Sequence, residues 1–117
     1  MDFVSKNKPL KHYHWGESGS CEGWILVDES GLSVKLEKMP PHTSEQKHVH
    51  KISQQFFYIL KGNAVFEIEN DHLELKTNQG IHIPAGKEHK IMNDGEEDLE
   101  LLLSSQPAIG NDRINKE

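Results

Sequence analysis

Apolar and polar side chains alternate along most of this chain. Leu32, Val34 and Leu36 are separated by polar residues, and the same period of two recurs along 64–69 and 99–103. Because successive side chains of an extended strand point to opposite faces, this period predicts strands with one buried apolar face and one polar outer face. We expect strands near 24–28, 32–39, 48–51, 55–60, 64–69, 72–76, 80–83, 89–93 and 99–104.

Short turn sequences separate these segments, and Gly62-Asn63 and Asp94-Gly95 are typical of tight hairpins. Many short strands at this spacing indicate an all-β sandwich or barrel. The length of 117 residues fits a single domain. Within it we expect an N-terminal arm over residues 1–20, the barrel over 21–104 and a polar C-terminal tail over 105–117.

Composition excludes several classes of function. The net charge is −6 and no basic cluster stands out, so binding to nucleic acid is not expected. No segment approaches the roughly 20 apolar residues needed to cross a bilayer, and the first residues lack the apolar core of a signal peptide. A single cysteine fits a reducing compartment, and we expect a cytoplasmic protein. The chain is rich in histidine, with eight residues, and histidine is the commonest metal ligand among side chains.

Two short segments concentrate the candidate chemistry. In His48-Val49-His50 the two imidazoles share a face of an extended segment, and a bend after them lets Gln55 face the same interior. The turn that begins with Pro84 delivers His89 at the start of a strand. Three imidazoles and one amide oxygen suit one divalent transition metal ion, and we predict that His48, His50, Gln55 and His89 are its ligands.

These two segments resemble the paired motifs of the cupin superfamily. The first reads HVH, KISQ, Gln55, FFYILK, Gly62, and the second reads PAGKEHKIMN, from Pro84 to Asn93. The resemblance covers roughly residues 24–104. It implies a cupin-type jelly-roll β-barrel, also called a double-stranded β-helix, with a metal inside it. It also implies a homodimer.

The chain departs from the cupin pattern at Gln55, where the family usually has a glutamate ligand. Glutamine can coordinate through its carbonyl oxygen but brings no negative charge, which disfavours high oxidation states of iron. We therefore expect the metal to act as a Lewis acid in an isomerase or lyase reaction on a small polar carbonyl or a sugar-derived acid. A similar ligand set occurs in the small cupins that linearise unsaturated uronates, but residues 103–107 lack their aspartate and aromatic partners.

Several alternatives stay open from the sequence. The chain could be an iron-dependent dioxygenase or a non-catalytic cupin that binds a small ligand, because fold does not fix chemistry. The metal could be Zn, Ni, Fe or Mn. His42 or Glu45 could supply a substitute ligand, and no general base stands out.

The remaining candidates concern the pocket and the surface. We expect Phe57, Ile59 and Asn93 to line the pocket beside the metal. His12 and His14 are expected on the surface. Arg113 could reach the mouth of the barrel, although nothing in the sequence places it there.

Overall fold

The computed structural model describes residues 2–16 and 18–116, and within them the chain forms β-strands and no helix. No described helix could therefore span a bilayer. The strands are β1 (Lys11–Trp15), β2 (Cys21–Glu29), β3 (Leu32–Met39), β4 (Thr43–Ser44), β5 (His48–Val49), β6 (Gln54–Lys61), β7 (Ala64–Ile68), β8 (Asp71–Leu75), β9 (Gly80–Ile83), β10 (His89–Asn93), β11 (Leu99–Gln106) and β12 (Ile114–Asn115).

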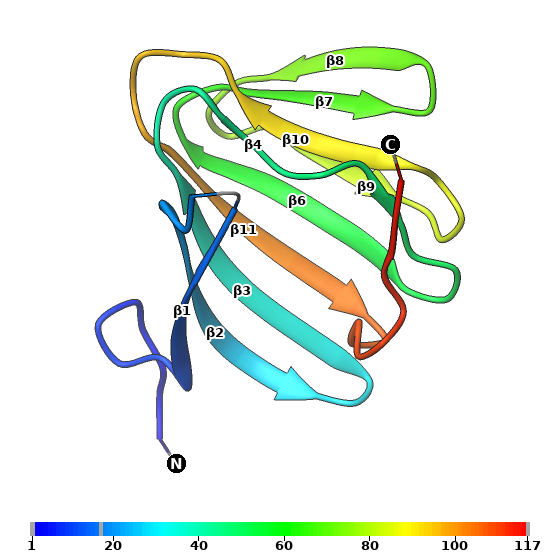
Figure 1. Cartoon of the computed structure of the whole chain (residues 1–117). Coiled ribbons are helices and arrows are strands. Elements are labelled where there is room, and N and C mark those ends of the chain that lie inside the picture. Colours follow the sequence, from blue (N-terminus) through cyan, green and yellow to red (C-terminus); the bar gives the residue numbers. More distant parts are fainter. Residues whose placement is uncertain (1, 17, 117) are drawn as a thin grey trace.

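The strands form two antiparallel sheets that face each other (Figure 1). The first sheet has the order β1-β2-β3-β11-β6-β9, and the second has the order β12-β5-β10-β7-β8, with β4 also paired to β10. Neighbours such as β3 and β11 are far apart in sequence, as expected when a chain winds back and forth between two layers. The predicted all-β jelly-roll barrel is confirmed.

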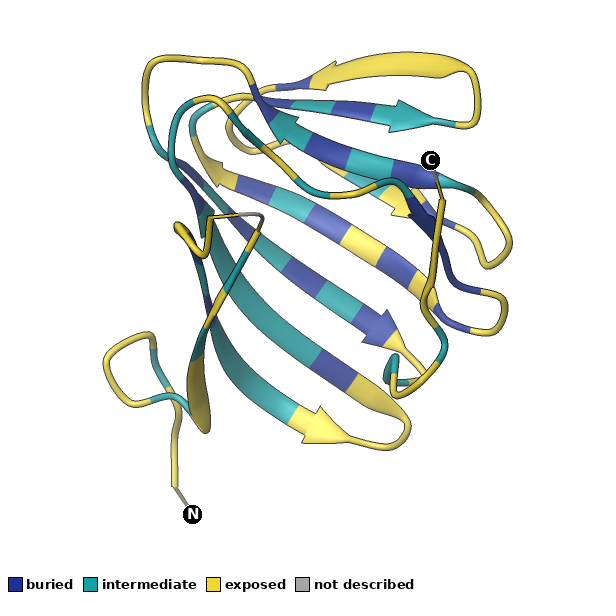
Figure 2. Cartoon of the chain, viewed as in Figure 1, coloured by how far each residue is buried: buried dark blue, intermediate teal, exposed yellow. Residues whose placement is uncertain are grey.

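Buried residues alternate with exposed or half-buried ones along β6 and with half-buried ones along most of β10 and β11 (Figure 2). The inward side chains of these strands meet in one apolar core that occupies one end of the barrel. Its fully buried members include Met39, Ile59, Phe66, Ile83, Leu99 and Leu101. This core leaves the other end of the barrel free to hold polar groups.

Strand β3 reverses the polarity expected from its sequence. Leu32 is 40% exposed whereas Ser33 is 5% exposed, and Lys35 and Glu37 line the internal cavity together with Ser33. Leu36 lies on the outer face of the sheet, directly opposite Trp24 of β2. The polar side chains of β3 are turned inward because they line a polar cavity. Its apolar Leu36 is turned outward, where it lies next to Trp24 and Leu102 on the outer face of the sheet.

Both ends of the chain join the sheets, which differs from the arm and tail expected from the sequence. Residues 11–15 form β1, which pairs with β2, and Tyr13 and Trp15 face the cavity. At the other end, β11 continues to Gln106, and β12 pairs with β5. The physical reason is that each terminal segment completes the hydrogen bonding of a strand that would otherwise be an open edge.

Candidate metal centre

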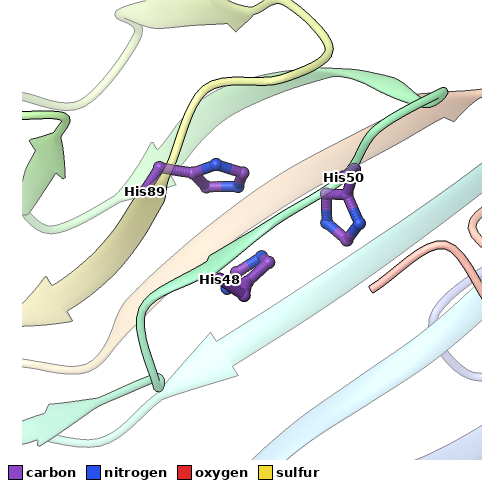
Figure 3. Close-up of side chains that lie close together, drawn as sticks. All are labelled: His48, His50 and His89. Atoms are coloured by element: carbon purple, nitrogen blue, oxygen red, sulfur yellow. The ribbon is translucent and has the colours of Figure 1, made fainter. Parts of the chain in front are cut away.

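Three imidazoles converge at one end of the barrel (Figure 3). His48 on β5 stands directly opposite His89 on β10, and their ring centroids lie 4.4 Å apart. The ring centroid of His50, just after β5, lies 4.8 Å from that of His48. One ligand atom from each ring lies within 4.8 Å of the others, and all three side chains are buried.

Each imidazole is oriented by a backbone carbonyl at its Nδ1 atom. Nδ1 lies 2.8 Å from the Gln46 oxygen in His48, 2.8 Å from the Asp112 oxygen in His50 and 2.9 Å from the Lys87 oxygen in His89. A carbonyl oxygen only accepts, so each Nδ1 carries the proton and each Nε2 presents its lone pair. This arrangement of carbonyl partners is the one that metal-binding histidines use.

Burial keeps these imidazoles neutral. Desolvation lowers the pKa of His48 to about 3, although its hydrogen bond to the Gln46 carbonyl acts in the opposite direction. The same desolvation lowers the pKa values of His50 and His89. Neutral imidazoles are the form that binds a metal, so the three rings are ready for coordination at neutral pH.

Gln55, the second residue of β6, places its side-chain oxygen beside the imidazoles. Its Oε1 atom lies 3.0 Å from Nε2 of His89, and its Nε2 atom donates to the Ser105 hydroxyl at 3.2 Å. Because Nε2 of neutral His89 has no proton, two acceptors face each other at this distance. A cation beside both atoms would remove this repulsion. The four side chains therefore fit a divalent transition metal ion, which both imidazole nitrogen and carbonyl oxygen can bind.

A cavity of about 360 Å³ adjoins this group, and His48, His50, Gln55 and Phe57 line part of it. Phe57 was expected there, but Ile59 and Asn93 are not among the described residues that line the cavity. Ile59 is fully buried in the apolar core, because it lies two residues further along β6.

Asn93 holds a turn instead of facing the cavity. Its side-chain amide donates to the carbonyl oxygens of Met39 and Glu97, each at 2.8 Å, and its Oδ1 atom accepts from the Gly95 amide at 3.0 Å. The Asn-Asp-Gly sequence is a signal for such a turn, because asparagine often bonds the backbone two residues later.

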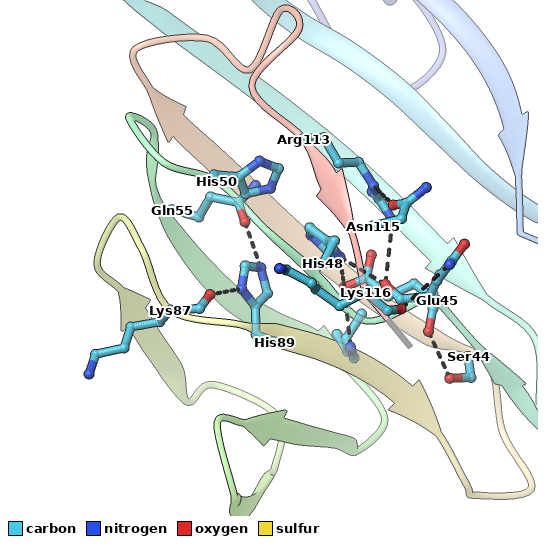
Figure 4. Close-up of polar contacts among 12 residues, drawn as sticks. Ser44, Glu45, His48, His50, Gln55, Lys87, His89, Arg113, Asn115 and Lys116 are labelled. Carbon is cyan, nitrogen blue, oxygen red and sulfur yellow. Dashed lines mark hydrogen bonds and ion pairs between the residues drawn. The ribbon is translucent and has the colours of Figure 1, made fainter.

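The C-terminal segment closes over the histidines (Figure 4). The carboxylate of Asp112 accepts hydrogen bonds of 2.8 to 2.9 Å from the amides of Lys51, Ile52 and Ser53, in the loop that follows His50. These bonds lower the pKa of the Asp112 carboxyl group, with the Ser53 amide contributing most. The fold therefore uses its last residues to fix the loop between two candidate ligands.

Further polar and charged side chains line the cavity, and of these only Arg113 was considered from the sequence as a residue at the mouth of the barrel. Tyr13, Lys35 and Glu37 line it from β1 and β3, and Arg113 lines it from the segment before β12. Arg113, the only arginine of the chain, donates to Asn115 Oδ1 at 2.9 Å. In the sequence, Lys35 and Glu37 are only two polar residues of an alternating strand. Because the apolar face of that strand was expected to be buried, these two side chains were expected on the outside.

The suggested substitute ligands lie outside the group of three imidazoles. The side chain of His42 is 64% exposed and lies 3.4 Å from a Glu96 oxygen. Glu45 also lines the cavity, and one of its oxygens lies 3.9 Å from Nδ1 of His48, the nitrogen that faces a carbonyl. Desolvation raises the pKa of Glu45 to about 8.

His12 and His14 lie on the surface, as expected. Both lie near Oε1 of Glu22, at 3.3 Å and 3.8 Å. The three side chains form a second group with the spacing of metal ligands, but this group is exposed on the outer side of the sheet.

Comparisons with known proteins agree with this architecture. A family model described as a cupin domain matches residues 35–105. An oxalate-binding protein of Thermotoga maritima is 34% identical over a match of 92 positions, gaps included, which covers 74% of this chain and 76% of that protein. An uncharacterised protein of Methanocaldococcus jannaschii is 34% identical over 65 residues, and the match covers 56% of this chain and only 52% of that protein.

Solved structures share the fold at low sequence identity. A predicted oxalate decarboxylase from Thermotoga maritima superposes with a TM-score of 0.81 at 22% identity, over 92% of this chain and 100% of that one. A sugar phosphate isomerase from Silicibacter pomeroyi gives a TM-score of 0.78 at 15% identity, over 92% and 76% of the two chains. At these identities the similarity concerns the fold alone.

Proposed function

This chain belongs to the cupin family, and from that premise we propose that it is a metal-dependent isomerase or lyase. The proposed substrate is a small polar carbonyl compound or a sugar-derived acid. One divalent transition metal ion would be held by His48, His50, Gln55 and His89. The observation that carries the proposal is the set of three buried Nε2 lone pairs and one amide oxygen that meet beside a polar cavity.

The charge of the four ligands favours this chemistry. All four are neutral, so a bound divalent ion keeps its full double charge. Such an ion polarises a carbonyl group and stabilises the negative charge that develops on its oxygen during proton transfer. Lys35 and Arg113 line the same cavity, beside the carboxyl groups of Asp28, Glu37 and Glu45. The two cationic side chains can pair with a carboxylate or phosphate group of a substrate. The structural neighbour described as a sugar phosphate isomerase uses the same fold.

A second candidate function is the capture of a small carboxylate without turnover. It is favoured by the relative described as an oxalate-binding protein, three quarters of whose length this chain matches. The same neutral metal site with Lys35 and Arg113 would bind a dicarboxylate. An iron-dependent dioxygenase is a third alternative, which a strict requirement for O₂ would identify.

The test begins with elemental analysis of untagged protein purified without added metal. The protein is then loaded with Zn, Ni, Fe or Mn, and each form is incubated in D₂O with D-glucuronate, D-galacturonate, D-fructose 6-phosphate or oxalate. We expect one ion per chain and, with a sugar acid or sugar phosphate, loss of the proton NMR signal next to the carbonyl. Tight binding of oxalate with no exchange on any sugar would favour the capture function instead.

We also propose that the protein is a homodimer. The outer face of the first sheet carries a cross-strand row of large side chains, in which Trp24 pairs with Leu36, Leu36 with Leu102, and Leu102 with Tyr58. Phe56, on the same strand as Tyr58, is 41% exposed. A second copy would cover this apolar face. Light scattering should give twice the chain mass, and Phe56→Glu should reduce it to that of one chain.

A further inference from the structure

Resting on the proposed function, we infer that Glu37 is the base that moves a proton on the substrate and that Tyr13 positions it. The substrate class this assigns is an α-hydroxy carbonyl compound, such as an aldose-derived acid. Glu37 comes from β3 and Tyr13 from β1, and both line the cavity that His48, His50 and Gln55 also line. No general base stands out in the sequence, and Glu37 fills this role in the proposed reaction.

The backbone register places the two side chains in one row. Tyr13 stands opposite Gly23 of β2, and Gly23 stands opposite Glu37. Since Gly23 has no side chain, the phenol ring lies across it, and a Cβ atom at this position would be 2.0 Å from Cζ of Tyr13. The hydroxyl group of Tyr13 thereby reaches Oε2 of Glu37 at 2.5 Å.

This contact leaves one carboxylate oxygen available. Among the described residues, Oε1 of Glu37 takes part in no hydrogen bond or ion pair, while Oε2 accepts from Tyr13. Desolvation raises the pKa of Glu37, and the Tyr13 hydrogen bond and the charge of Lys35 partly offset the rise. Burial and the nearby carboxylate raise the pKa of Tyr13, so its hydroxyl stays protonated as a donor. A carboxylate fixed on one side and open on the other is suited to accept a proton.

The step that Glu37 would perform is a proton shift without net oxidation. Glu37 takes the proton from the hydroxyl-bearing carbon next to the carbonyl. The electron pair of that C–H bond forms a C=C bond, and the π pair of the C=O bond moves to its oxygen, which gives an enediolate. The hydroxyl proton on that carbon passes to the former carbonyl oxygen. Glu37 then returns its proton to the former carbonyl carbon, so that the carbonyl group has moved by one position and no other reactant is consumed.

The test compares metal-loaded wild type with Glu37→Gln, which keeps the shape of the side chain but cannot accept the proton. D-Glucuronate in D₂O is the probe, followed by proton NMR, and metal content is measured in parallel. Glu100→Gln, on the outer face of β11, is the control for loss of a carboxylate elsewhere in the same sheet. We expect exchange to fall by about 100-fold or more in Glu37→Gln, as for loss of a general base, with one ion per chain retained.

Two other outcomes are distinguishable. If wild type exchanges and Glu37→Gln stays within tenfold of it, the assignment of Glu37 is wrong while the proposed function stands. If wild type shows no exchange with any metal, the proposed function fails and this inference fails with it.

Tyr13→Phe tests the positioning role through the pH profile. The charged and titratable groups around Glu37 are Tyr13 from β1, Cys21 from β2, Lys35 from β3, Glu45 from the loop before β5, and Arg113. The Tyr13 hydrogen bond favours the ionised form of Glu37, so its loss raises the Glu37 pKa. The acid limb of kcat/KM should therefore move to higher pH in Tyr13→Phe. An unchanged limb with a uniformly lower rate would show that Tyr13 has only a structural role.

Discussion

Asp112 ties the C-terminal segment to His50, because its carbonyl oxygen lies 2.8 Å from Nδ1 of an imidazole 62 positions earlier in the chain. The Asp112 carboxylate meanwhile binds the amides of the loop that follows His50. One residue near the end of the chain thus fixes both the orientation of a candidate ligand and the path of the backbone towards Gln55.

We expect Asp112→Ala to weaken metal binding by about tenfold. The variant keeps the backbone carbonyl that faces Nδ1 of His50, but it loses the carboxylate that holds the loop after His50, so this carbonyl and the path towards Gln55 are no longer fixed. The measurement is competition with a chromophoric chelator for Zn²⁺. Asp71→Ala, at the exposed start of β8, is the control. Equal affinity in Asp112→Ala and Asp71→Ala would mean that the carboxylate has no influence on the site.

Gln55→Glu should tighten Zn²⁺ binding on the order of tenfold, because the new ligand brings a negative charge next to a divalent ion. Calorimetric titration with Zn²⁺ measures the change. Gln54→Glu, at the exposed neighbour on the same strand, is the matched control. If the two variants change the affinity equally, Gln55 does not contact the metal.

Gly23→Ala should destabilise the fold by roughly 1–3 kcal/mol, as expected when a methyl group enters a filled space. The methyl group would overlap the ring of Tyr13, whereas a Cβ at Gly31 meets no atom within 4 Å. Urea unfolding of Gly23→Ala and Gly31→Ala gives the comparison. Because Gly→Ala lowers the entropy of the unfolded chain and so favours folding, an equal stability loss in both variants would show that the overlap with Tyr13 is not the cause.

The ion-pair group around Glu67 predicts a pH dependence of stability. Its Oε1 atom lies 2.8 Å from Nζ of Lys47, and this contact is the main reason that the Glu67 pKa is lowered. A carboxyl group with a lowered folded pKa stabilises the fold above its unfolded pKa, near 4.5, and loses this contribution as the pH falls below that value.

Glu67→Gln should therefore show a smaller loss of stability than wild type when the pH falls from about 5 to about 3. Urea midpoints at several pH values measure the difference. Glu74→Gln, on the exposed part of β8, should keep the wild-type slope. A Glu67→Gln slope equal to that of wild type would refute the contribution of the ion pair.

Arg113→Gln should weaken the binding of oxalate to the metal-loaded protein by about tenfold, because it removes the only arginine at the cavity. Calorimetry at two ionic strengths tests this, and the wild-type affinity should fall more with salt than that of the variant. Lys116→Gln, also near the C-terminus, serves as the control for a lost positive charge. Oxalate affinity that is the same in all three proteins would exclude Arg113 from the binding site.

The spacing of the two motifs was enough to predict that His48, His50, Gln55 and His89 come together, since same-face positions of strands keep their phase over short distances. Binding of the metal itself stays a prediction. The same phase argument placed Ile59 and Asn93 beside the metal, and it failed for them because the cavity occupies only one end of the barrel.

Residues outside the motifs were not predictable in this way. Glu37 and Lys35 belong to a strand whose alternation is clear, but alternation gives two faces without saying which one is inside. Tyr13 and Arg113 lie in segments expected to be an arm and a tail. Their position depends on pairing with β2 and β5, which are contacts between distant parts of the chain.

The inward polar row of β3 has an implication for how this protein could acquire new selectivity. Ser33, Lys35 and Glu37 are presented to the cavity by a strand whose backbone is paired on both sides, with β2 and with β11. Substituting those side chains changes the charge that lines the cavity, while the backbone hydrogen bonds of β3 to β2 and β11 do not depend on the side chains. Substitutions at these three alternate positions can therefore change which ligands the cavity accepts, while the three histidines stay in place.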